Sequence, residues 1–391
     1  MKTIVFFSTP AKGHINAVYP IIKNLCKSKY NVIVYSSNEF KDFFISLGAK
    51  FVEYPINFDN FNLKHITADF YTLAQNLVTL NDSIYNLMLK EIQKLNPTLI
   101  IYDSMCSFGK LISYKLNIKS MCFVTTLAFN PWVYFLKGMF LNDMPMLIQN
   151  AKGLLHLIKK EKFFRKNNSL PKFSIIDLFV NECEKTIVFT PPEFQPLRRT
   201  FKNNFYFVGT TIKDRLKESH KHIDTTKFDT VDIYISLGTI FTENKFILSK
   251  FINDYQNSNS NIVISAGKLF KSLENYDNII TKENVNQLEV LKKSRIFINH
   301  AGLNSVYESI YLGVYQICIP QQKEQLLVAK IIDKKRLGKY IKILRKKSNF
   351  NKLTCNKNNN NNNNNITKYK NIFKKYDATE ITLNIIKKYI G

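Results

Sequence analysis

The sequence lacks any long uninterrupted hydrophobic segment, although hydrophobic residues make up 45% of its 391 residues. A helix that crosses a bilayer needs about twenty apolar residues with few or no charges, and no such stretch occurs. The N-terminus, MKTIVFFSTPAKGH, has only a short apolar run and no small-residue cleavage site. We therefore expect a first core strand there and not a signal peptide. The length allows one large domain or two ordinary ones.

Cysteine is scarce, and the six cysteines form no C-x-x-C pair and share no metal-ligand spacing. A disulfide framework or a zinc site would show such patterns. We therefore expect reduced thiols in a cytoplasmic protein, and no bound metal.

Acidic residues are few, so that 56 lysines and arginines against 30 aspartates and glutamates give a formal charge of +26. Such a charge can indicate a nucleic-acid-binding protein. No ribonucleoprotein motif or zinc-finger spacing accompanies it, so we do not expect nucleic acid as a partner. A dianionic nucleotide or peripheral contact with an anionic membrane surface agrees better with the pattern.

Short apolar runs alternate with helical patterns along most of the chain, beginning with TIVFFS at 3–8 and NAVYPIIKNLCKS at 16–28. This alternation is typical of an α/β fold with parallel, doubly wound sheets. It lapses in a helical, basic and aromatic region at 131–175. It lapses again in the polar stretch 213–229, which we interpret as a linker. We predict two Rossmann-like domains facing across a cleft, at 1–212 and 230–370, followed by a C-terminal helix at 371–391. The asparagine run, about 356–366, is predicted to be a disordered insertion.

The stretch INHAGLNSVYESI at 298–310 has the features of an anion site at a strand-to-helix turn. Gly302 allows a tight turn, and Asn304 and Ser305 stand at a predicted helix N-terminus, where free N–H groups and the helix dipole favour an anion. His300 can donate a further hydrogen bond, and the Glu308 carboxylate suits a ribose diol. Either Asn304 or Ser305 alone is explained as well by ordinary helix capping.

This stretch resembles the nucleotide-diphosphate motif of UDP-dependent glycosyltransferases of the GT-B fold, and in particular the macrolide and secondary-metabolite glycosyltransferases. The resemblance extends to TPAKGHINAVYPIIKNL, IIYDSMCSFGKLIS, ISLGT, ISAGK and IPQQKEQ. It implies a UDP-glycosyltransferase, a hexosyltransferase that inverts the anomeric configuration of the transferred sugar.

The resemblance also implies a role for two residues of the N-terminal half. His14, just after Gly13 and between the first strand and its helix, matches the general base that takes the proton from an acceptor hydroxyl. Asp103, at the end of a predicted strand, matches the carboxylate that orients the base. Without the resemblance, a structural histidine and a helix-capping aspartate remain alternatives.

Further positions match the residues that hold the donor. His300, Gly302, Asn304 and Ser305 match contacts to the diphosphate, and Glu308 matches a contact to the ribose. The other matches are Thr239 on the phosphate side, Val285 and Gln287 for uracil and ribose, and the pair Glu324 and Gln325 for the sugar hydroxyls. The glutamine of that pair is associated with glucose donors. No cofactor or metal is expected besides the UDP-sugar, and the donor half has no D-x-D motif.

The sequence departs from the family at the uracil site, where Asn284 occupies the position of an aromatic residue and Asn286 that of a proline. The acceptor is expected to be set by residues 60–90 and 131–175. The apolar and aromatic residues of 131–175 favour a lipophilic small molecule, followed by a membrane lipid or sterol. An amphipathic helix packed on the core explains them equally well.

Other functions on the same fold are a UDP-N-acetylglucosamine transferase, an epimerase, and a non-catalytic nucleotide-sugar-binding homologue or partner subunit. The pair of His14 and Asp103 on the same chain as the donor motif argues against the epimerase and against a partner subunit. A non-catalytic homologue stays an alternative because of Asn284 and Asn286. The oligomeric state is not indicated by the sequence.

Overall fold

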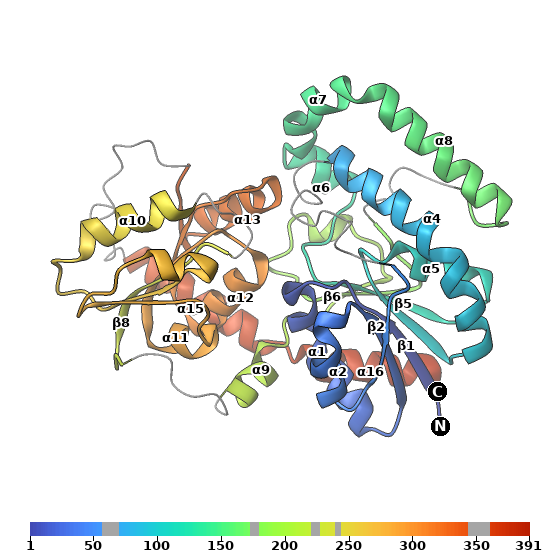
Figure 1. Ribbon diagram of the computed structural model, residues 1–391, viewed down its shortest axis with the longest axis horizontal. Coiled ribbons are helices and arrows are strands. Elements are labelled where there is room, and N and C mark those ends of the chain that lie inside the picture. Colours follow the sequence, from blue (N-terminus) through green and yellow to red (C-terminus); the bar gives the residue numbers. More distant parts are fainter. Residues whose placement is uncertain (57–69, 173–179, 220–226, 239–243, 343–359) are drawn as a thin grey trace. The chain divides into compact units, whose positions relative to one another are not determined.

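The computed structural model describes the chain except for residues 57–69, 173–179, 220–226, 239–243 and 343–359 (Figure 1). The chain forms two compact units. Unit 1 comprises Met1–Thr211 together with Tyr376–Gly391, and unit 2 comprises Ile212–Lys375.

Unit 1 is built on a seven-stranded parallel sheet in the order β3-β2-β1-β4-β5-β6-β7. Its strands are short runs rich in β-branched and aromatic residues, as buried parallel strands require. They are β1 (Thr3–Phe7), β2 (Asn31–Ser36), β3 (Lys50–Glu53), β4 (Leu99–Asp103), β5 (Ser120–Val124), β6 (Lys185–Val188) and β7 (Phe205–Phe207).

The helices of unit 1 cover both faces of this sheet. They are α1 (Lys12–Lys27), η1 (Asn38–Phe40), α2 (Lys41–Ser46), α4 (Phe70–Leu95), α5 (Ser107–Lys115), α6 (Pro131–Leu136), α7 (Met139–Gln149), α8 (Ala151–Asn167), η4 (Arg198–Thr200) and α16 (Ala378–Ile390). Because side chains alternate along a strand, Ile4 and Phe6 of β1 pack with α1, α2 and α16, whereas Val5 and Phe7 pack with α4 and α5.

Unit 2 repeats this plan with a six-stranded parallel sheet in the order β10-β9-β8-β11-β12-β13. Its strands are β8 (Val231–Ser236), β9 (Ile262–Ser265), β10 (Ile279–Lys282), β11 (Ser294–Asn299), β12 (Tyr315–Cys318) and β13 (Gly338–Tyr340). Its helices are α9 (Ile212–Ser219), α10 (Asn244–Tyr255), η5 (Gly267–Ser272), α11 (Gln287–Lys293), α12 (Leu303–Leu312), α13 (Lys323–Lys334) and α15 (Asn360–Lys375). The prediction of two doubly wound parallel-sheet domains is thus confirmed.

Some predicted boundaries are wrong. The linker predicted at 213–229 begins with a helix, α9, which belongs to unit 2. The predicted C-terminal helix is two helices, and α16 returns to unit 1. The helix after the first strand begins at Lys12, so His14 lies in its first turn and not before it.

The insertion predicted to be disordered is helical from Asn360 onward, as the start of α15, while 356–359 lie outside the described residues. Asparagine has a weak helix propensity, which a helix anchored elsewhere by tertiary packing can override. Further along α15, Phe373 is fully buried and its ring lies 5.3 Å from that of Tyr307 in α12.

The cysteines that the structure describes, at positions 26, 106, 122, 183 and 318, are all free thiols, as predicted. Cys355 lies outside the described residues. Within the described ranges, no helix combines the length and the apolar character needed to cross a membrane.

Candidate functional site

The two units place chemically active side chains at equivalent points of their sheets. In unit 1, β1 lies between β2 and β4, so the chain turns in opposite directions after β1 and after β4. In unit 2, β8 lies in the same way between β9 and β11. Doubly wound sheets bind ligands at such switch points, beyond the carboxyl ends of the strands.

Three residues of unit 1 meet at its switch point. His14 follows β1, Asp103 is the last residue of β4, and Thr125 follows β5. His14 Nδ1 lies 2.8 Å from Asp103 Oδ2 and 2.7 Å from Thr125 Oγ1. The Asp103 side chain is 4% exposed and that of His14 is 20% exposed, so the carboxylate is shielded while the imidazole keeps access to solvent.

The Asp103 carboxylate is held on both oxygens, with His14 and Thr125 on Oδ2 and two further donors on Oδ1. Thr9 Oγ1 donates to Oδ1 at 2.8 Å, and the Met105 amide donates to the same oxygen at 2.9 Å. Burial by itself would raise the pKa of Asp103, but electrostatic attraction to His14, its hydrogen bond and those of Met105 and Thr9 outweigh burial and hold the pKa below its ordinary value. The carboxyl group therefore orders the turn after β4 and also contacts the histidine.

This arrangement fixes the imidazole tautomer. Because an ionised carboxylate has no hydrogen to give, Nδ1 of His14 carries the hydrogen and donates it to Asp103. Nε2 is then left with the lone pair that can accept a proton. The geometry agrees with the predicted roles of a base and its orienting acid, which remain predictions.

In unit 2, His300 follows β11 and packs over two glycines. A Cβ at Gly238, which has φ +82°, would lie 3.3 Å from the His300 ring, and a Cβ at Gly302 would lie 2.5 Å from Nε2. Only glycine at these two positions lets the ring lie against both backbone segments. Burial lowers the pKa of His300, and the backbone of Ser236 partly offsets this effect. The ring therefore favours its neutral form.

The turn that follows His300 is tight. Ala301 adopts φ +62°, and its amide donates to the buried Asn299 Oδ1 at 2.7 Å. Gly302 is the N-cap of α12, so Asn304 and Ser305 lie in the first turn of that helix, as predicted. Backbone N–H groups of a first helical turn and the helix dipole together favour an anion.

Gln287, Ser305 and Glu308 form one connected polar cluster. Gln287 Nε2 donates to Ser305 Oγ at 3.0 Å and to Glu308 Oε2 at 2.6 Å. The Tyr234 hydroxyl donates to Gln287 Oε1 at 3.2 Å. The residues predicted to contact uracil, ribose and phosphate are thus brought together by direct hydrogen bonds.

Glu308 also has a partner that the sequence analysis missed. Arg215 of α9 donates through Nη2 to Glu308 Oε1 at 2.6 Å, and the two side chains are 10% and 3% exposed. A nearly buried carboxylate in an apolar helix requires a cation or several donors nearby. The single carboxylate in the mostly apolar sequence of α12 was therefore a sign that a cation lies near Glu308. Arg215 was not identified because it lies in the stretch that we interpreted as a linker.

The predicted sugar-binding pair stands at the start of α13, after β12. Glu324 and Gln325 are in the first turn of that helix. Gln325 Oε1 accepts from the Gln321 amide at 2.9 Å, and Gln321 Nε2 donates to the Leu237 carbonyl oxygen at 3.2 Å. These bonds tie the turn after β12 to the turn after β8, at the same sheet edge as His300.

The remaining predicted positions are less informative. Thr239 lies outside the described residues. Val285 is partly buried and packs against the core of unit 2. Asn284, where relatives are expected to have an aromatic side chain, is exposed.

Comparison with known proteins decides the family. The family model "UDP-glucoronosyl and UDP-glucosyl transferase" matches residues 233–376. The chain is 32% identical to the NDP-glycosyltransferase YjiC of Bacillus subtilis (strain 168) over 343 residues, which cover 86% of this chain and 84% of that protein. The chain belongs to the UDP-glycosyltransferase family.

This glycosyltransferase is also similar to another protein of Bacillus subtilis (strain 168), "Uncharacterized UDP-glucosyltransferase YojK". The two are 28% identical over 355 residues, which are 88% of this chain and 85% of that protein. The crystal structure of the glycotransferase of kitacinnamycin matches 100% of this chain and 99% of its own, with a TM-score of 0.85 and 16% identity. That likeness confirms the predicted GT-B fold, and the family confirms the predicted activity, the transfer of a sugar from a nucleotide sugar.

Proposed function

We propose that this glycosyltransferase moves a hexose, with glucose as the first candidate, from a UDP-sugar to a hydroxyl group of a lipophilic small molecule. In the proposed reaction, the acceptor oxygen attacks the anomeric carbon from the face opposite UDP. The acceptor proton passes to His14, the bond from the anomeric carbon to the diphosphate breaks, and UDP leaves. The configuration of the sugar inverts.

The contact between His14 and Asp103 is the observation that carries this proposal. At 2.8 Å the carboxylate fixes the tautomer in which Nε2 carries the lone pair that accepts a proton. As His14 gains a proton, the neighbouring Asp103 charge stabilises the imidazolium. A positioned base of this kind contributes typically about 10²–10⁴-fold to the rate.

The donor half of the proposal rests on the cluster around α12. The leaving diphosphate gains negative charge, which the N-terminus of α12 and a hydrogen bond from His300 are suited to stabilise. The Glu308 carboxylate, held by Arg215 and Gln287, would accept hydrogen bonds from the ribose hydroxyls. We propose that these groups suffice without a metal ion. Glu324 and Gln325, in the first turn of α13, would bind the sugar hydroxyls.

The proposed acceptor class rests on unit 1. Seven large apolar side chains on α6, α7 and α8 are more than half exposed: Trp132, Phe135, Leu136, Leu141, Ile148, Leu155 and Phe163. A lipophilic acceptor suits such a region, and a membrane lipid or sterol is the second candidate acceptor.

The test is UDP release by purified protein, supplied with a panel of UDP-sugars and hydroxylated aromatic and sterol acceptors, with and without a chelator. The test variant is His14→Ala. The matched control is His156→Ala, because His156 is an exposed histidine of α8 in the same unit.

The proposal expects acceptor-dependent UDP release that is lost in His14→Ala, kept in His156→Ala and unchanged by chelator. The best donor and acceptor of the panel then give the sugar and the acceptor class. Turnover by His14→Ala at the wild-type rate would exclude the histidine as the base, and loss of activity with chelator would exclude the metal-free mechanism.

A further inference from the structure

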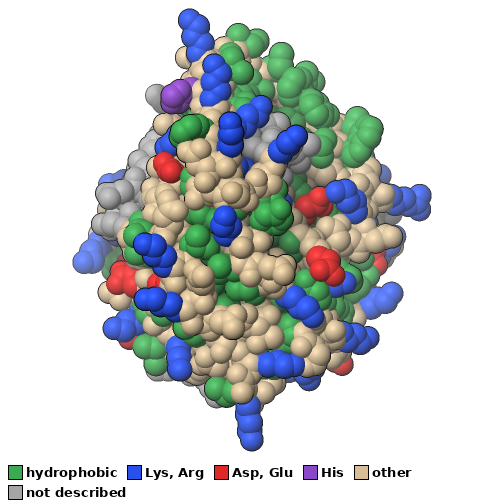
Figure 2. Space-filling view, turned by 90° about the vertical axis from the view of Figure 1, so that its right-hand side faces the viewer, with side chains coloured by type: hydrophobic (Ala, Val, Ile, Leu, Met, Phe, Trp, Pro, Cys, Tyr) green, Lys and Arg blue, Asp and Glu red, His purple; other side chains and the backbone are tan. Residues whose placement is uncertain are grey.

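Helices α6, α7 and α8 present an unusual surface, which we call the apolar-lysine surface. It combines the seven exposed apolar side chains named above with exposed lysines at 152, 159, 160, 162, 166 and 172. Figure 2 shows hydrophobic side chains gathered at the top of one face, with lysines and arginines beside them. Exposed apolar patches of this kind usually mark an interaction site.

The outer face of α8 follows from its helical period. Lys152, Leu155, Lys159, Phe163 and Lys166 recur every three or four residues and are exposed. Leu157, Glu161, Phe164 and Arg165 lie on the opposite side and are buried. Apolar residues therefore occur on both sides of the helix. One side packs against the core of unit 1, and the other is exposed to solvent.

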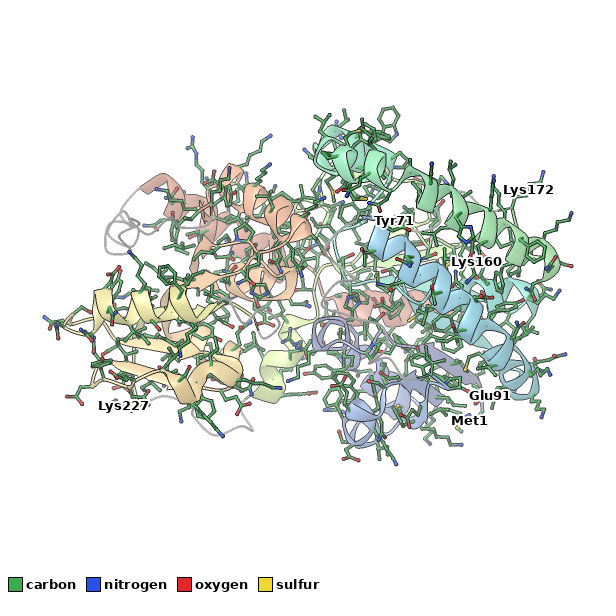
Figure 3. All side chains as sticks on the ribbon, turned by 45° about the horizontal axis from the view of Figure 1, so that its top comes forward. Met1, Tyr71, Glu91, Lys160, Lys172 and Lys227 are labelled. Carbon is green, nitrogen blue, oxygen red and sulfur yellow. The ribbon has the colours of Figure 1, made fainter. Side chains whose placement is uncertain are left out.

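Packing on α4 fixes which side faces outward. Leu157 packs with Ala74 and Leu77 of α4. A Cβ at Gly153 would overlap the Tyr71 hydroxyl, so the glycine admits that ring between the helices. Lys160 Nζ lies 3.0 Å from Asp82 Oδ2 at the edge of this contact. Figure 3 labels Tyr71 and Lys160 where α4 and α8 run side by side. The packing of α8 on α4 thus orients the outer face of α8 away from the core of unit 1.

The segment that forms the apolar-lysine surface exposes no acidic side chain of its own, although Asp82 of α4, which is 46% exposed, pairs with Lys160 at its edge. From Pro131 to Lys172 the sequence has two acidic residues, Asp143 and Glu161. Asp143 is 4% exposed and accepts from the Tyr134 hydroxyl at 3.0 Å, while Glu161 is 1% exposed and bonds to Arg165 at 2.8 Å. Because both carboxylates are buried and paired, the charge that this surface shows to solvent is positive.

We propose that the apolar-lysine surface binds anionic membrane surfaces, with its aromatic and aliphatic side chains in the interface and its lysines on the lipid headgroups. Aromatic rings and lysine chains both combine an apolar body with a polar end, which suits the boundary between acyl chains and water. Each lysine near an anionic leaflet adds to the attraction.

Other occupants fit less well. A second copy of the chain, in a two-fold contact, would bring the same lysines against each other, and the acidic group at the edge, Asp82, is already paired with Lys160. A nucleic acid would satisfy the lysines, but aliphatic side chains such as Leu136, Leu141 and Ile148 have no matching group on a phosphate backbone. A bilayer accepts both the charges and the apolar groups.

The chain offers a direct reporter, because its single tryptophan, Trp132, lies on this surface and is exposed. Full-length protein is titrated with vesicles of phosphatidylcholine alone and of phosphatidylcholine with phosphatidylglycerol. We measure Trp132 emission, its quenching by lipids brominated on the acyl chain, and co-sedimentation.

Two double variants separate the contribution of the lysines to vesicle binding from that of the apolar side chains. Lys159→Glu with Lys166→Glu reverses charge, and Leu155→Gln with Phe163→Gln removes apolar groups, all at exposed positions of α8. The matched control is Lys245→Glu with Phe246→Gln, an exposed lysine beside an exposed phenylalanine on α10 of unit 2.

We expect a blue shift and bromolipid quenching of Trp132 with anionic vesicles, and weak or no binding to neutral ones. The charge variant should lower the partition coefficient at least about tenfold, and the apolar variant by a similar factor, while the control binds like wild type. Added salt should weaken binding.

The proposal would be overturned by no response of Trp132 to anionic vesicles, by equal binding by both α8 variants and wild type, or by self-association in sedimentation velocity that the α8 variants abolish. Tight RNA binding that is lost in the charge variant alone would assign the surface to nucleic acid. Vesicle binding is measured without substrates, so failure here leaves the proposed role of His14 in sugar transfer untouched and bears only on the membrane lipid as second candidate acceptor.

Discussion

The ion pair between Arg215 and Glu308 makes a quantitative prediction about unit 2. The substitution is Arg215→Ala, which leaves a carboxylate that is 3% exposed without its cation at 2.6 Å. Removing one partner of a buried ion pair costs about 3–5 kcal/mol. Because Gln287 still donates to Glu308, we expect the lower end, about 3 kcal/mol.

The assay is hydrogen exchange of the α12 amides, followed by mass spectrometry of peptides covering Leu303–Leu312. A loss of about 3 kcal/mol lowers their protection by about a hundredfold, since each 1.4 kcal/mol is a factor of ten. Peptides from α1 in unit 1 serve as the internal reference.

The matched control is Lys217→Ala on the same helix, α9. Lys217 pairs with Asp214 at 2.8 Å, but its side chain is 65% exposed, so its loss should cost less than about 0.5 kcal/mol. The double variant Arg215→Ala with Glu308→Gln should regain at least about 1 kcal/mol, because it removes the uncompensated charge. If Arg215→Ala changes α12 protection no more than Lys217→Ala does, the reasoning about a buried pair is wrong.

Three further predictions address the sites directly. Asp103→Asn should lower kcat by about 10²–10⁴-fold with little change in the Kd for UDP, because it disturbs the His14 tautomer; a proportionate change in UDP affinity would contradict this. Asn284→Trp should tighten UDP binding in calorimetry by about tenfold, since base stacking contributes about 1–3 kcal/mol; unchanged affinity would mean that the base does not lie at this position. Because burial holds the pKa of His300 below its ordinary value, the unfolded chain takes up a proton first as pH falls. The contribution of neutral His300 to the free energy of unfolding of unit 2 should therefore be complete above about pH 6.5. Below that pH the free energy of unfolding should decline, by at most about 1.4 kcal/mol per pH unit. His300→Gln should flatten this decline in urea titrations between pH 5 and 8, and an unchanged slope would assign it to other groups.

The sequence predicted most of the fold because strand and helix periods are local. The alternation placed His14 after the first strand, Asp103 at the end of a strand and Gly302 at a strand-to-helix turn, and the strand order of the structure then showed that these strands meet at the switch points. The resemblance to glycosyltransferases then supplied roles that spacing alone leaves open.

The predictions that were wrong concern helices whose positions depend on contacts between distant segments of the sequence. Helix α9 is mostly polar, and its packing depends on the ion pair between Arg215 and Glu308, which lie 93 positions apart in the sequence. Helix α15 starts in an asparagine run that local propensity does not favour, and its Phe373 packs against Tyr307 of α12. Neither contact can be derived from local periodicity.

The central claim is that His14 removes the proton of the acceptor, and it is tested most directly by acceptors of different acidity. We would measure kcat/KM of wild type and His14→Ala with an aliphatic alcohol and with a phenol that is already ionised at the assay pH. The account predicts a loss of about 10²–10⁴-fold for the alcohol and little loss for the phenolate, which needs no base. An equal loss with both acceptors would contradict it and assign His14 to binding.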